Sequence, residues 1–485
     1  MGMAAKCPVI VAMGNNGGPW EQTRHLWRMP NGTAMERSVE RSIFWTAAVQ
    51  LPNALMGFLT GICITRLLGG DGRGWYALLQ SDVAVLSLLF SLNLGSGLVY
   101  FLSRAPEKAD RILGVAAGCL LFASGSILLL MAAVWLFDLP MGPFLPEGEF
   151  RTWSLVYVGL MVVLAMSHSM FNGVFLGLRK FRVVNQMTLV SSVLLFLAYG
   201  LFFLLRHQLP ERDTLSLVLA VSLGASALVN VLWAVLYRVH VRSRPLLAGS
   251  QAMLRPMLAF SLVGYLATLV NLLNYRMDVW FVQGFRGAGE LGVYAVAVGM
   301  AQIFFLLPDP LARVLQPHLV GRTDKEVMER FGLFSRMAFT GVLGGGALLM
   351  LLADLFFPLL YGPGFAPSAA AFRLLMPGIA VACSTKLLAL LVIRTGKVGY
   401  NLLAASIGLA VTIGLDWALV PVHGAQGAAI ASSAAYFAVF LSVLMVLRFR
   451  FRLPWANYFI LMPADIRWMW FRAFNKAKAA GSGRE

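Results

Sequence analysis

The chain has 485 residues, of which 59% are hydrophobic and 13% charged, and its mean hydropathy is +0.75. This is more apolar surface than a soluble protein of this size could bury, so the composition excludes a soluble globular fold and predicts an all-α polytopic membrane protein. The formal net charge is +17. Because the Lys and Arg residues fall in short loops and at both chain ends, they are typical of positive-inside topology and argue against a nucleic-acid partner.

Residues 1–41 are polar, Gly-rich and basic, and we expect them to form a disordered cytosolic tail. Hydrophobic segments of about 20 residues follow, long enough to cross about 30 Å of hydrocarbon. We predict twelve spans near residues 42–65, 76–101, 112–137, 153–176, 183–205, 214–238, 256–277, 290–316, 333–357, 369–393, 400–421 and 425–447.

The distribution of basic residues supports this count. With the N-terminus in the cytosol, 30 of the 39 Lys and Arg residues lie on the cytosolic side and 8 on the opposite side, while Lys386 lies within a span. Such a bias indicates an even number of spans with both termini in the cytosol. We therefore expect a multi-pass protein of the cytoplasmic (inner) membrane. All predicted loops are short, so function should reside within the helix bundle.

Two pairs of matching residues indicate an internal repeat. Gly74-Trp-Tyr-Ala and Gly292-Val-Tyr-Ala lie 218 residues apart, and Lys180 and Lys397 lie 217 apart. Each half contains six predicted spans, so the two halves should have the same orientation in the membrane. This arrangement predicts a parallel repeat, related by an axis along the membrane normal.

The predicted organisation is therefore an N-lobe, a basic cytosolic linker and a C-lobe, at residues 42–239, 240–255 and 256–447. Residues 448–485 mix Arg with Trp and Phe. This composition is typical of an interfacial segment on an anionic membrane leaflet. We expect it to serve as a simple anchor.

Lys386 is a candidate substrate-binding residue because it lies well inside a predicted span. A cation at that depth costs about 2.5–3.5 kcal/mol on insertion scales, so it should face a water-filled cavity or a carboxylate. The alternative is a lysine that extends to the cytosolic interface near Arg394.

A polar stripe is predicted on the span that opens the second half. Asn271, Asn274 and Asp278 have the spacing i, i+3 and i+7, which places them on one face of a helix. Together with Arg276 they would suit a sugar or pyrophosphate head group, since Asn donates and accepts hydrogen bonds and Arg matches phosphate geometry. The alternative is a helix end where Arg276 and Asp278 pair at the aqueous boundary.

Arg66, at the end of the first span, could bind substrate at the non-cytosolic mouth or anchor the helix at the interface. Asp82 lies within the second span, and with Asp278 it is a candidate for binding a coupling proton or sodium ion; otherwise Asp82 caps a short helix. No other cofactor is expected. The four cysteines, at positions 7, 63, 119 and 383, show neither metal-ligand spacing nor a disulfide framework.

Weaker candidates share a polar side chain within a span, where they could line a cavity or join helices: Gln50, Asn53, Asn93, His168, Asn172 and Gln302. Prolines within spans predict bends that alternating access could use, and Leu307-Pro-Asp-Pro-Leu311 is the sharpest of these.

The stretch Ile64-Thr-Arg-Leu-Leu-Gly-Gly-Asp-Gly-Arg-Gly-Trp-Tyr-Ala77 resembles the first turn of the bacterial polysaccharide repeat-unit flippases (O-antigen and exopolysaccharide), which belong to the multidrug/oligosaccharidyl-lipid/polysaccharide (MOP) exporter superfamily. Asp278 to Pro308 resembles the start of the second half in that family. The turns at Leu360–Phe365 and Val422–Ala429 resemble its turns before spans ten and twelve. The similarity covers roughly residues 40 to 450.

The resemblance implies a V-shaped two-lobe bundle with a cationic central cavity. Such a protein moves an undecaprenyl-pyrophosphate-linked oligosaccharide from the cytosolic to the outer leaflet, and Arg66, Arg276 and Lys386 would be candidates for the cationic lining. The implied partners are this lipid-linked oligosaccharide, membrane lipids, a polysaccharide polymerase and glycosyltransferases. The chain departs from the pattern in its basic N-terminal extension. Its twelve spans disfavour the peptidoglycan-precursor flippases, which have fourteen.

Other functions remain open. An ion-coupled multidrug exporter of the same superfamily would combine apolar aromatic pockets with acids, whereas the candidates here are mostly cations and amides. An integral membrane glycosyltransferase or polymerase would need a sizeable non-cytosolic loop, so an enzyme is not expected. A non-transport scaffold is the remaining alternative.

Overall fold

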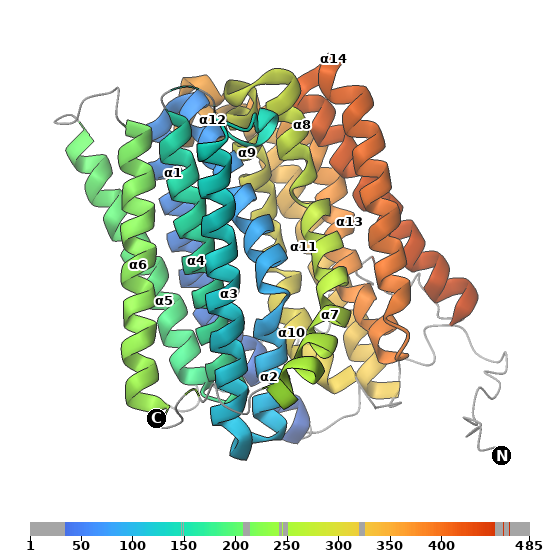
Figure 1. Cartoon of the computed structure of the whole chain (residues 1–485). Coiled ribbons are helices and arrows are strands. Elements are labelled where there is room, and N and C mark those ends of the chain that lie inside the picture. The colour runs from blue at the N-terminus through green and yellow to red at the C-terminus, as the bar shows by residue number, and fades with distance from the viewer. Residues whose placement is uncertain are drawn as a thin grey trace, which may run out of the picture.

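The computed structural model describes residues 34–146, 148, 150–206, 214–241, 245, 251–319, 325–451, 459 and 465. Within these ranges all regular structure is helical, and the helices stand side by side in one bundle (Figure 1). The α-helices are α1 (Ala34–Ser91), α2 (Leu94–Arg104), α3 (Ala109–Leu136), α4 (Phe150–Gly177), α5 (Phe181–Leu205), α6 (Thr214–His240), α7 (Gln251–Asn274), α8 (Met277–Arg286), α9 (Ala288–Gln302), α10 (Pro308–Leu319), α11 (Lys325–Leu351), α12 (Ala353–Tyr361), α13 (Ser368–Arg394) and α14 (Gly399–Met445).

Among the described residues, ten helical stretches are long and apolar enough to cross a membrane. Two of these are double, because Gly69 in α1 and Gly424 in α14 have positive φ angles of 65° and 53° that interrupt the helical backbone. Glycine adopts such angles without the steric cost that a Cβ would impose. Divided at these two glycines, the ten stretches become twelve spans, which confirms the predicted number.

The second, seventh and eighth spans are broken among the described residues. The second span joins the end of α1 to α2 through Leu92 and Asn93, which have φ angles of 47° and 57°. The seventh span breaks between α7 and α8. The eighth passes from α9 through a 3-10 turn (Ile303–Leu306) to α10, which begins at Pro308. A proline lacks the N–H that would continue the α-helical ladder, so the predicted bend at Leu307–Leu311 is present.

The parallel repeat is visible in the backbone. Gly69 and Gly287, which are 218 residues apart, both have positive φ, and so do Arg179 and Gly396, which are 217 apart. Helices α1–α6 form the first half and α7–α14 the second. Equivalent residues of the two halves can therefore be compared with these offsets.

The two halves meet through backbone atoms near the start of α9. A Cβ built on Gly74 would lie 1.8 Å from the carbonyl oxygen of Ala288, and one built on Gly292 would lie 2.1 Å from that of Gly70. The two contacts are related by the repeat, since Gly70 and Gly74 correspond to Ala288 and Gly292. We call this contact between residues 70–74 and 288–292 the glycine crossing. It is a small-xxx-small contact, in which the missing side chains let helix backbones touch.

A second contact between the halves lies on α2, toward the end of the bundle away from α12 (Figure 1). Here the Tyr100 ring stacks on Phe260 of α7 with centroids 4.0 Å apart. A Cβ on Gly97 would come within 2.5 Å of the Ser261 hydroxyl oxygen. The halves therefore touch at both ends, through backbone at one and largely through side chains at the other.

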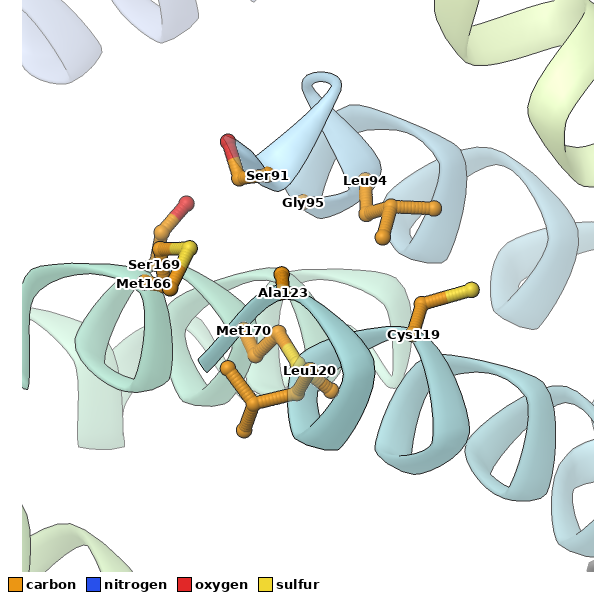
Figure 2. Close-up of a pocket in the computed structure, with 9 residues that line it drawn as sticks. All are labelled: Ser91, Leu94, Gly95, Cys119, Leu120, Ala123, Met166, Ser169 and Met170. Atoms are coloured by element: carbon orange, nitrogen blue, oxygen red, sulfur yellow. The ribbon is translucent and has the colours of Figure 1, made fainter. Parts of the chain in front are cut away.

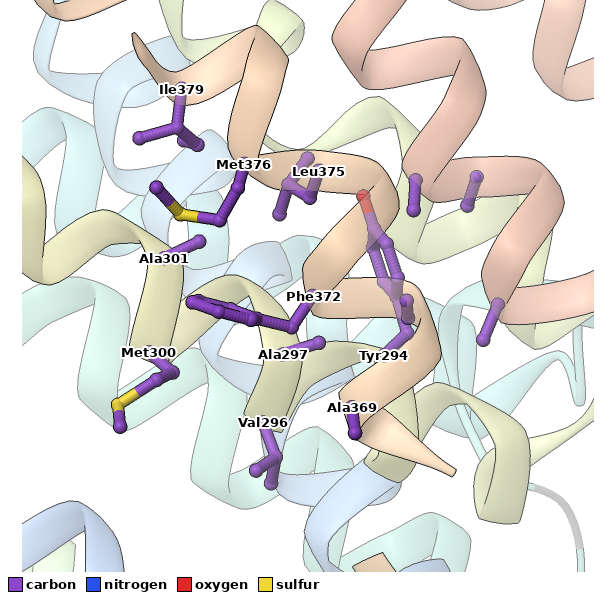
Figure 3. Close-up of a cluster of buried hydrophobic side chains, with 14 of the residues drawn as sticks. Tyr294, Val296, Ala297, Met300, Ala301, Ala369, Phe372, Leu375, Met376 and Ile379 are labelled. Carbon is purple, nitrogen blue, oxygen red and sulfur yellow. The ribbon is translucent and has the colours of Figure 1, made fainter. Parts of the chain in front are cut away.

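The largest apolar cluster lies mainly in the second half, includes Leu78 of α1, and holds α9 against α13. Figure 3 shows Phe372 and Met376 of α13 facing the small residues Ala297 and Ala301 of α9. Tyr294 belongs to the same cluster and is 1% exposed. This packing fixes the helices that carry the polar residues described below.

The structure describes only some of the residues at the boundaries of the predicted domains. Residues 1–33 of the predicted tail lie outside the described residues, and residues 34–41 belong to α1. In the predicted linker, α6 ends at His240 and α7 begins at Gln251. In the predicted interfacial segment, the Asp465 carboxylate binds the Arg336 guanidinium through two contacts of 2.7 and 2.8 Å. Phe459 packs edge-on against Phe339 and Phe440, so these two described residues contact C-lobe helices.

Candidate functional site

A cavity of about 220 Å³ lies between α7, α13 and α14, and we call it the C-lobe cavity. Amide, hydroxyl and ammonium groups line much of it. The lining residues are Asn271, Asn274, Tyr275, Ala382, Thr385, Lys386, Ala389, Asn401, Ala405, Tyr436, Val439 and Val443. Three predicted substrate-binding residues, Asn271, Asn274 and Lys386, are therefore brought together.

Lys386 has a carboxylate partner inside the bundle. Its Nζ donates to Asp309 Oδ1 at 2.7 Å and lies 3.8 Å from the centroid of the Phe305 ring. The two side chains are 26% and 39% exposed, so both remain within reach of a ligand. Asp309 was not among the predicted site residues. The signal for it was its position between Pro308 and Pro310, where the break in the eighth span turns the first residues of α10 toward α13.

The two asparagines have different roles in the packing. The Asn274 amide donates to the carbonyl oxygens of Val270 at 3.0 Å and Ala405 at 2.8 Å, which ties α7 to α14. Among the described residues, Asn271 donates only to Ala267 of its own helix, and it is exposed. Asn271 is therefore the better placed of the two to contact a ligand.

The expected continuous stripe through Asp278 is wrong, because α7 ends at Asn274 and Asp278 lies on α8. Asp278 is 4% exposed. Its carboxylate accepts hydrogen bonds from the backbone N–H of Val279 at 2.9 Å and the Ser432 hydroxyl at 3.2 Å, and also from the Tyr294 hydroxyl. Asp278 thus belongs to a separate buried polar site.

Asp416 of α14 is the second acid of this buried site. It is 0% exposed, and neither carboxylate oxygen has a hydrogen-bond partner among the described residues. It lies close enough to Asp278 for the two charges to interact. Two neighbouring acids in an apolar bundle are costly unless a proton or a cation neutralises them. The sequence did contain the signal, since Asp416 is an acid within the predicted span 400–421.

Asp82 and Arg66 both contact the opposite half of the protein. Asp82 accepts a hydrogen bond from Trp280 Nε1 at 2.7 Å, and its other carboxylate oxygen is buried with no partner among the described residues. Arg66 donates from Nε to the carbonyl oxygen of Leu360 at 2.7 Å and also donates to Leu359. Arg66 therefore caps the carbonyl end of α12 and is not among the residues that line the C-lobe cavity.

Arg276 lies at the break between α7 and α8, next to the cavity-lining Tyr275. It is near enough to Arg73 of the first half for their charges to interact. The Arg73 guanidinium stands 5.7 Å from the Tyr76 ring centroid, and its buried Nε has no partner in the described part of the chain. Arg73 was missed as a candidate, although it lies in the Gly-rich motif of the first turn.

Of the weaker candidates, Asn53 and His168 bond to residues of other helices, as expected for groups that join helices, and Asn93 bonds to a residue of the adjoining α2. Asn53 bonds to Ser192, His168 accepts from Trp233 Nε1 at 3.2 Å, and Asn93 accepts from Ser96 at 3.0 Å. The N-lobe has a much smaller cavity of about 10 Å³, which could hold about one water molecule. Figure 2 shows Ser91, Leu94 and Gly95 on one side of it and residues of α3 and α4 on the other.

Residues 39–321, more than half of the chain, match the family profile described as "Polysaccharide biosynthesis protein". The chain belongs to this family. Curated proteins give no match by sequence.

Solved structures share the fold over most of the chain. The lipid II flippase MurJ in an inward closed conformation has a TM-score of 0.68 at 12% identity, covering 86% of this chain and 89% of its own. An inward-facing multidrug resistance MATE family transporter of the MOP superfamily has a TM-score of 0.63 at 17% identity, covering 84% and 98%. An outward-facing one has 0.59 at 15% identity, covering 85% and 96%.

The family profile confirms the predicted polysaccharide family, and the solved structures confirm the predicted two-lobe all-α fold. The protein is a multi-pass membrane protein of the polysaccharide biosynthesis family.

Proposed function

We propose that this protein is a flippase that moves an undecaprenyl-pyrophosphate-linked oligosaccharide repeat unit across the cytoplasmic membrane, with both termini in the cytosol. The C-lobe cavity carries this proposal, because it offers a polar site within membrane-spanning helices in a member of a polysaccharide biosynthesis family. A sugar head group needs such a site, while its prenyl tail stays in lipid. Rocking of the two lobes would expose the site to each side in turn.

Arg73 and Arg276 are our candidates for holding the pyrophosphate. They come from different lobes, and Arg276 follows directly on the cavity-lining Tyr275. Their like charges oppose each other, and an anion between them would relieve that repulsion. Arginine also offers paired donors that match phosphate oxygens.

Asp278 and Asp416 are our candidates for the coupling site. A proton or sodium ion bound there would neutralise two buried acids that otherwise oppose each other. Asp82 is a second candidate, since its bond to Trp280 joins the lobes and would respond to a change at the carboxylate.

The runner-up is an ion-coupled multidrug exporter of the same superfamily. The observation in its favour is the aromatic side of the C-lobe cavity, where the Tyr275 ring lies 5.9 Å from Tyr436 and 6.0 Å from Phe305, close to the buried acids. A cationic drug would suit these rings and acids, whereas a pyrophosphate would suit Arg73 and Arg276.

A reconstituted assay separates these functions. Proteoliposomes containing a pyrophosphate-linked prenyl oligosaccharide are treated with a lectin that detects only sugars on the outer leaflet. We expect the wild-type protein to expose the sugar, and Arg276→Gln to slow exposure by about tenfold or more. Arg286→Gln is the matched control, since Arg286 pairs with Glu290 at the surface. Failure of the wild-type protein to expose the sugar, combined with efflux of a cationic dye, would favour the exporter.

A further inference from the structure

At the C-lobe cavity one positive and one negative side chain, Lys386 and Asp309, are in direct contact. Lys386 Nζ and Asp309 Oδ1 are 2.7 Å apart, so the ammonium and carboxylate charges largely cancel for a ligand a few ångströms away. Lys386 keeps further N–H donors, and Asp309 keeps its second oxygen as an acceptor. The pair therefore offers hydrogen bonds of both kinds without a net charge.

The surroundings of this pair suit a sugar ring. Tyr275 and Tyr436 supply aromatic surface in the cavity, and Phe305 lies under the Lys386 ammonium. Asn271 adds an exposed amide that both donates and accepts. Flat apolar surface beside a few polar groups that fix orientation is the usual composition of a small-molecule site.

The repeat shows that this pair is not required by the fold. With the offsets of 218 and 217, Ser91 and Ser169 of the N-lobe occupy the positions of Asp309 and Lys386. Both serines line the N-lobe cavity in Figure 2, which has about 10 Å³, compared with about 220 Å³ in the C-lobe. At these positions the N-lobe has two hydroxyl groups and a cavity with room for about one water molecule. At these two positions the C-lobe therefore has a charged pair and the N-lobe has two serines.

We infer that the C-lobe cavity is a subsite for one uncharged sugar ring of the head group, and that Asp309 sets this preference by cancelling the charge of Lys386. The inference rests on the proposed flippase function and names the part of the substrate that enters this cavity. At about 220 Å³ the cavity is smaller than the roughly 300–1,000 Å³ of sites for drug-sized ligands, so it holds one ring and not an oligosaccharide. The pyrophosphate remains outside it, at Arg73 and Arg276.

The test measures binding of three short-chain prenyl pyrophosphates to the full-length protein in nanodiscs. One lipid carries a neutral hexose, one a hexuronic acid, and one no sugar. The wild-type protein should bind the neutral glycolipid about tenfold or more tightly than the acidic one. Asp309→Asn leaves Lys386 with an uncompensated positive charge, so it should reverse this order. The double variant Lys386→Gln/Asp309→Asn is again uncharged and should restore the preference for the neutral sugar.

Two controls distinguish specificity from damage. Asp354→Asn removes the acid of an exposed pair with Arg373 and should leave the order of the three lipids unchanged. Ala389→Leu fills the cavity and should weaken binding of both glycolipids while sparing the lipid without sugar. Ala418→Leu adds the same side chain on the exposed face of α14 and should change none of them.

The outcomes separate the two levels of the argument. Binding of none of the three lipids by the wild-type protein would overturn the proposed function. Equal binding of all three would leave that function standing and overturn the sugar subsite. If the Asp309→Asn variant has the wild-type melting temperature and binds the three lipids in the wild-type order of affinity, Asp309 does not determine the sugar preference. If that variant does not fold, the double variant and Ala389→Leu decide the question.

Discussion

Gly74→Ala should pull the two lobes apart at the glycine crossing. A Cβ at position 74 would lie 1.8 Å from the carbonyl oxygen of Ala288, whereas ordinary contacts begin at 3.4 Å. The atom in the way belongs to the backbone and has no rotamer to escape into. The α1 and α9 backbones must therefore separate by about 1.6 Å at this point.

The repeat sharpens the expected magnitude. Gly292→Ala creates the equivalent clash, 2.1 Å from the carbonyl oxygen of Gly70, which requires a separation of about 1.3 Å. Overpacking typically costs about 1–3 kcal/mol. A cost of about 3 kcal/mol would lower the equilibrium ratio of closed to separated crossing by a factor of more than about 100. The double variant should lose little more than either single variant, because one separation relieves both clashes.

Disulfide formation in the variant Asp71→Cys/Gly289→Cys measures closure of the glycine crossing. A Cβ on Gly289 would lie 2.6 Å from Asp71 Oδ1, so the introduced thiols meet only when the crossing is closed. In a background without the native cysteines, Gly74→Ala should slow cross-linking by about the factor above. Gly61→Ala in α1 and Gly299→Ala in α9 are controls, because a Cβ at either position meets nothing within 4 Å. Cross-linking of Gly74→Ala at the control rate would refute this account.

Three further predictions follow from buried charges. Arg336→Met should lower the free energy of unfolding by about 3–5 kcal/mol, because Asp465 loses a partner in a pair whose side chains are each 11% exposed. Thermal unfolding in detergent measures this loss. Arg373→Met, which breaks an exposed ion pair, is the control and should lower the free energy of unfolding by at most about 1 kcal/mol. Trp280→Phe should cost about 1–3 kcal/mol, since neither oxygen of the buried Asp82 carboxylate then keeps a partner among the described residues; Trp417→Phe, at a 69% exposed position, is its control. Asp416→Asn should reduce any rise in melting temperature that sodium or acid gives the parent protein, because it removes one of the two acids to be neutralised. An unchanged rise would exclude Asp416 from the ion site.

Local patterns in the sequence were sufficient to predict most of the fold. Apolar length and the distribution of Lys and Arg predicted twelve spans, and the Gly74 and Gly292 motifs predicted the repeat. What the sequence could not show was that these two motifs touch each other. A contact between residues 218 apart depends on how the lobes pack, and the missing side chain of a glycine is equally consistent with a turn.

The site residues were predictable only one at a time. An isolated Lys386 within a span implies a partner, but nothing local identifies that partner as Asp309. The helix break at Tyr275 and Arg276 also could not be predicted, because no proline or glycine lies there. This break removed Asp278 from the expected stripe and placed it on α8, where it is buried.

The two lobes share a backbone plan but not its chemistry. With the same offsets, Thr60 and Tyr199 occupy the N-lobe positions of Asp278 and Asp416, just as Ser91 and Ser169 occupy those of Asp309 and Lys386. At all four positions the N-lobe has an uncharged polar residue where the C-lobe has a charge. The contacts that join the lobes at the glycine crossing are, by contrast, matched on both sides. Since a repeat preserves what both halves need, the crossing follows from the symmetric architecture. At these four positions the charges lie in the C-lobe only, so the backbone shared by both halves does not require them.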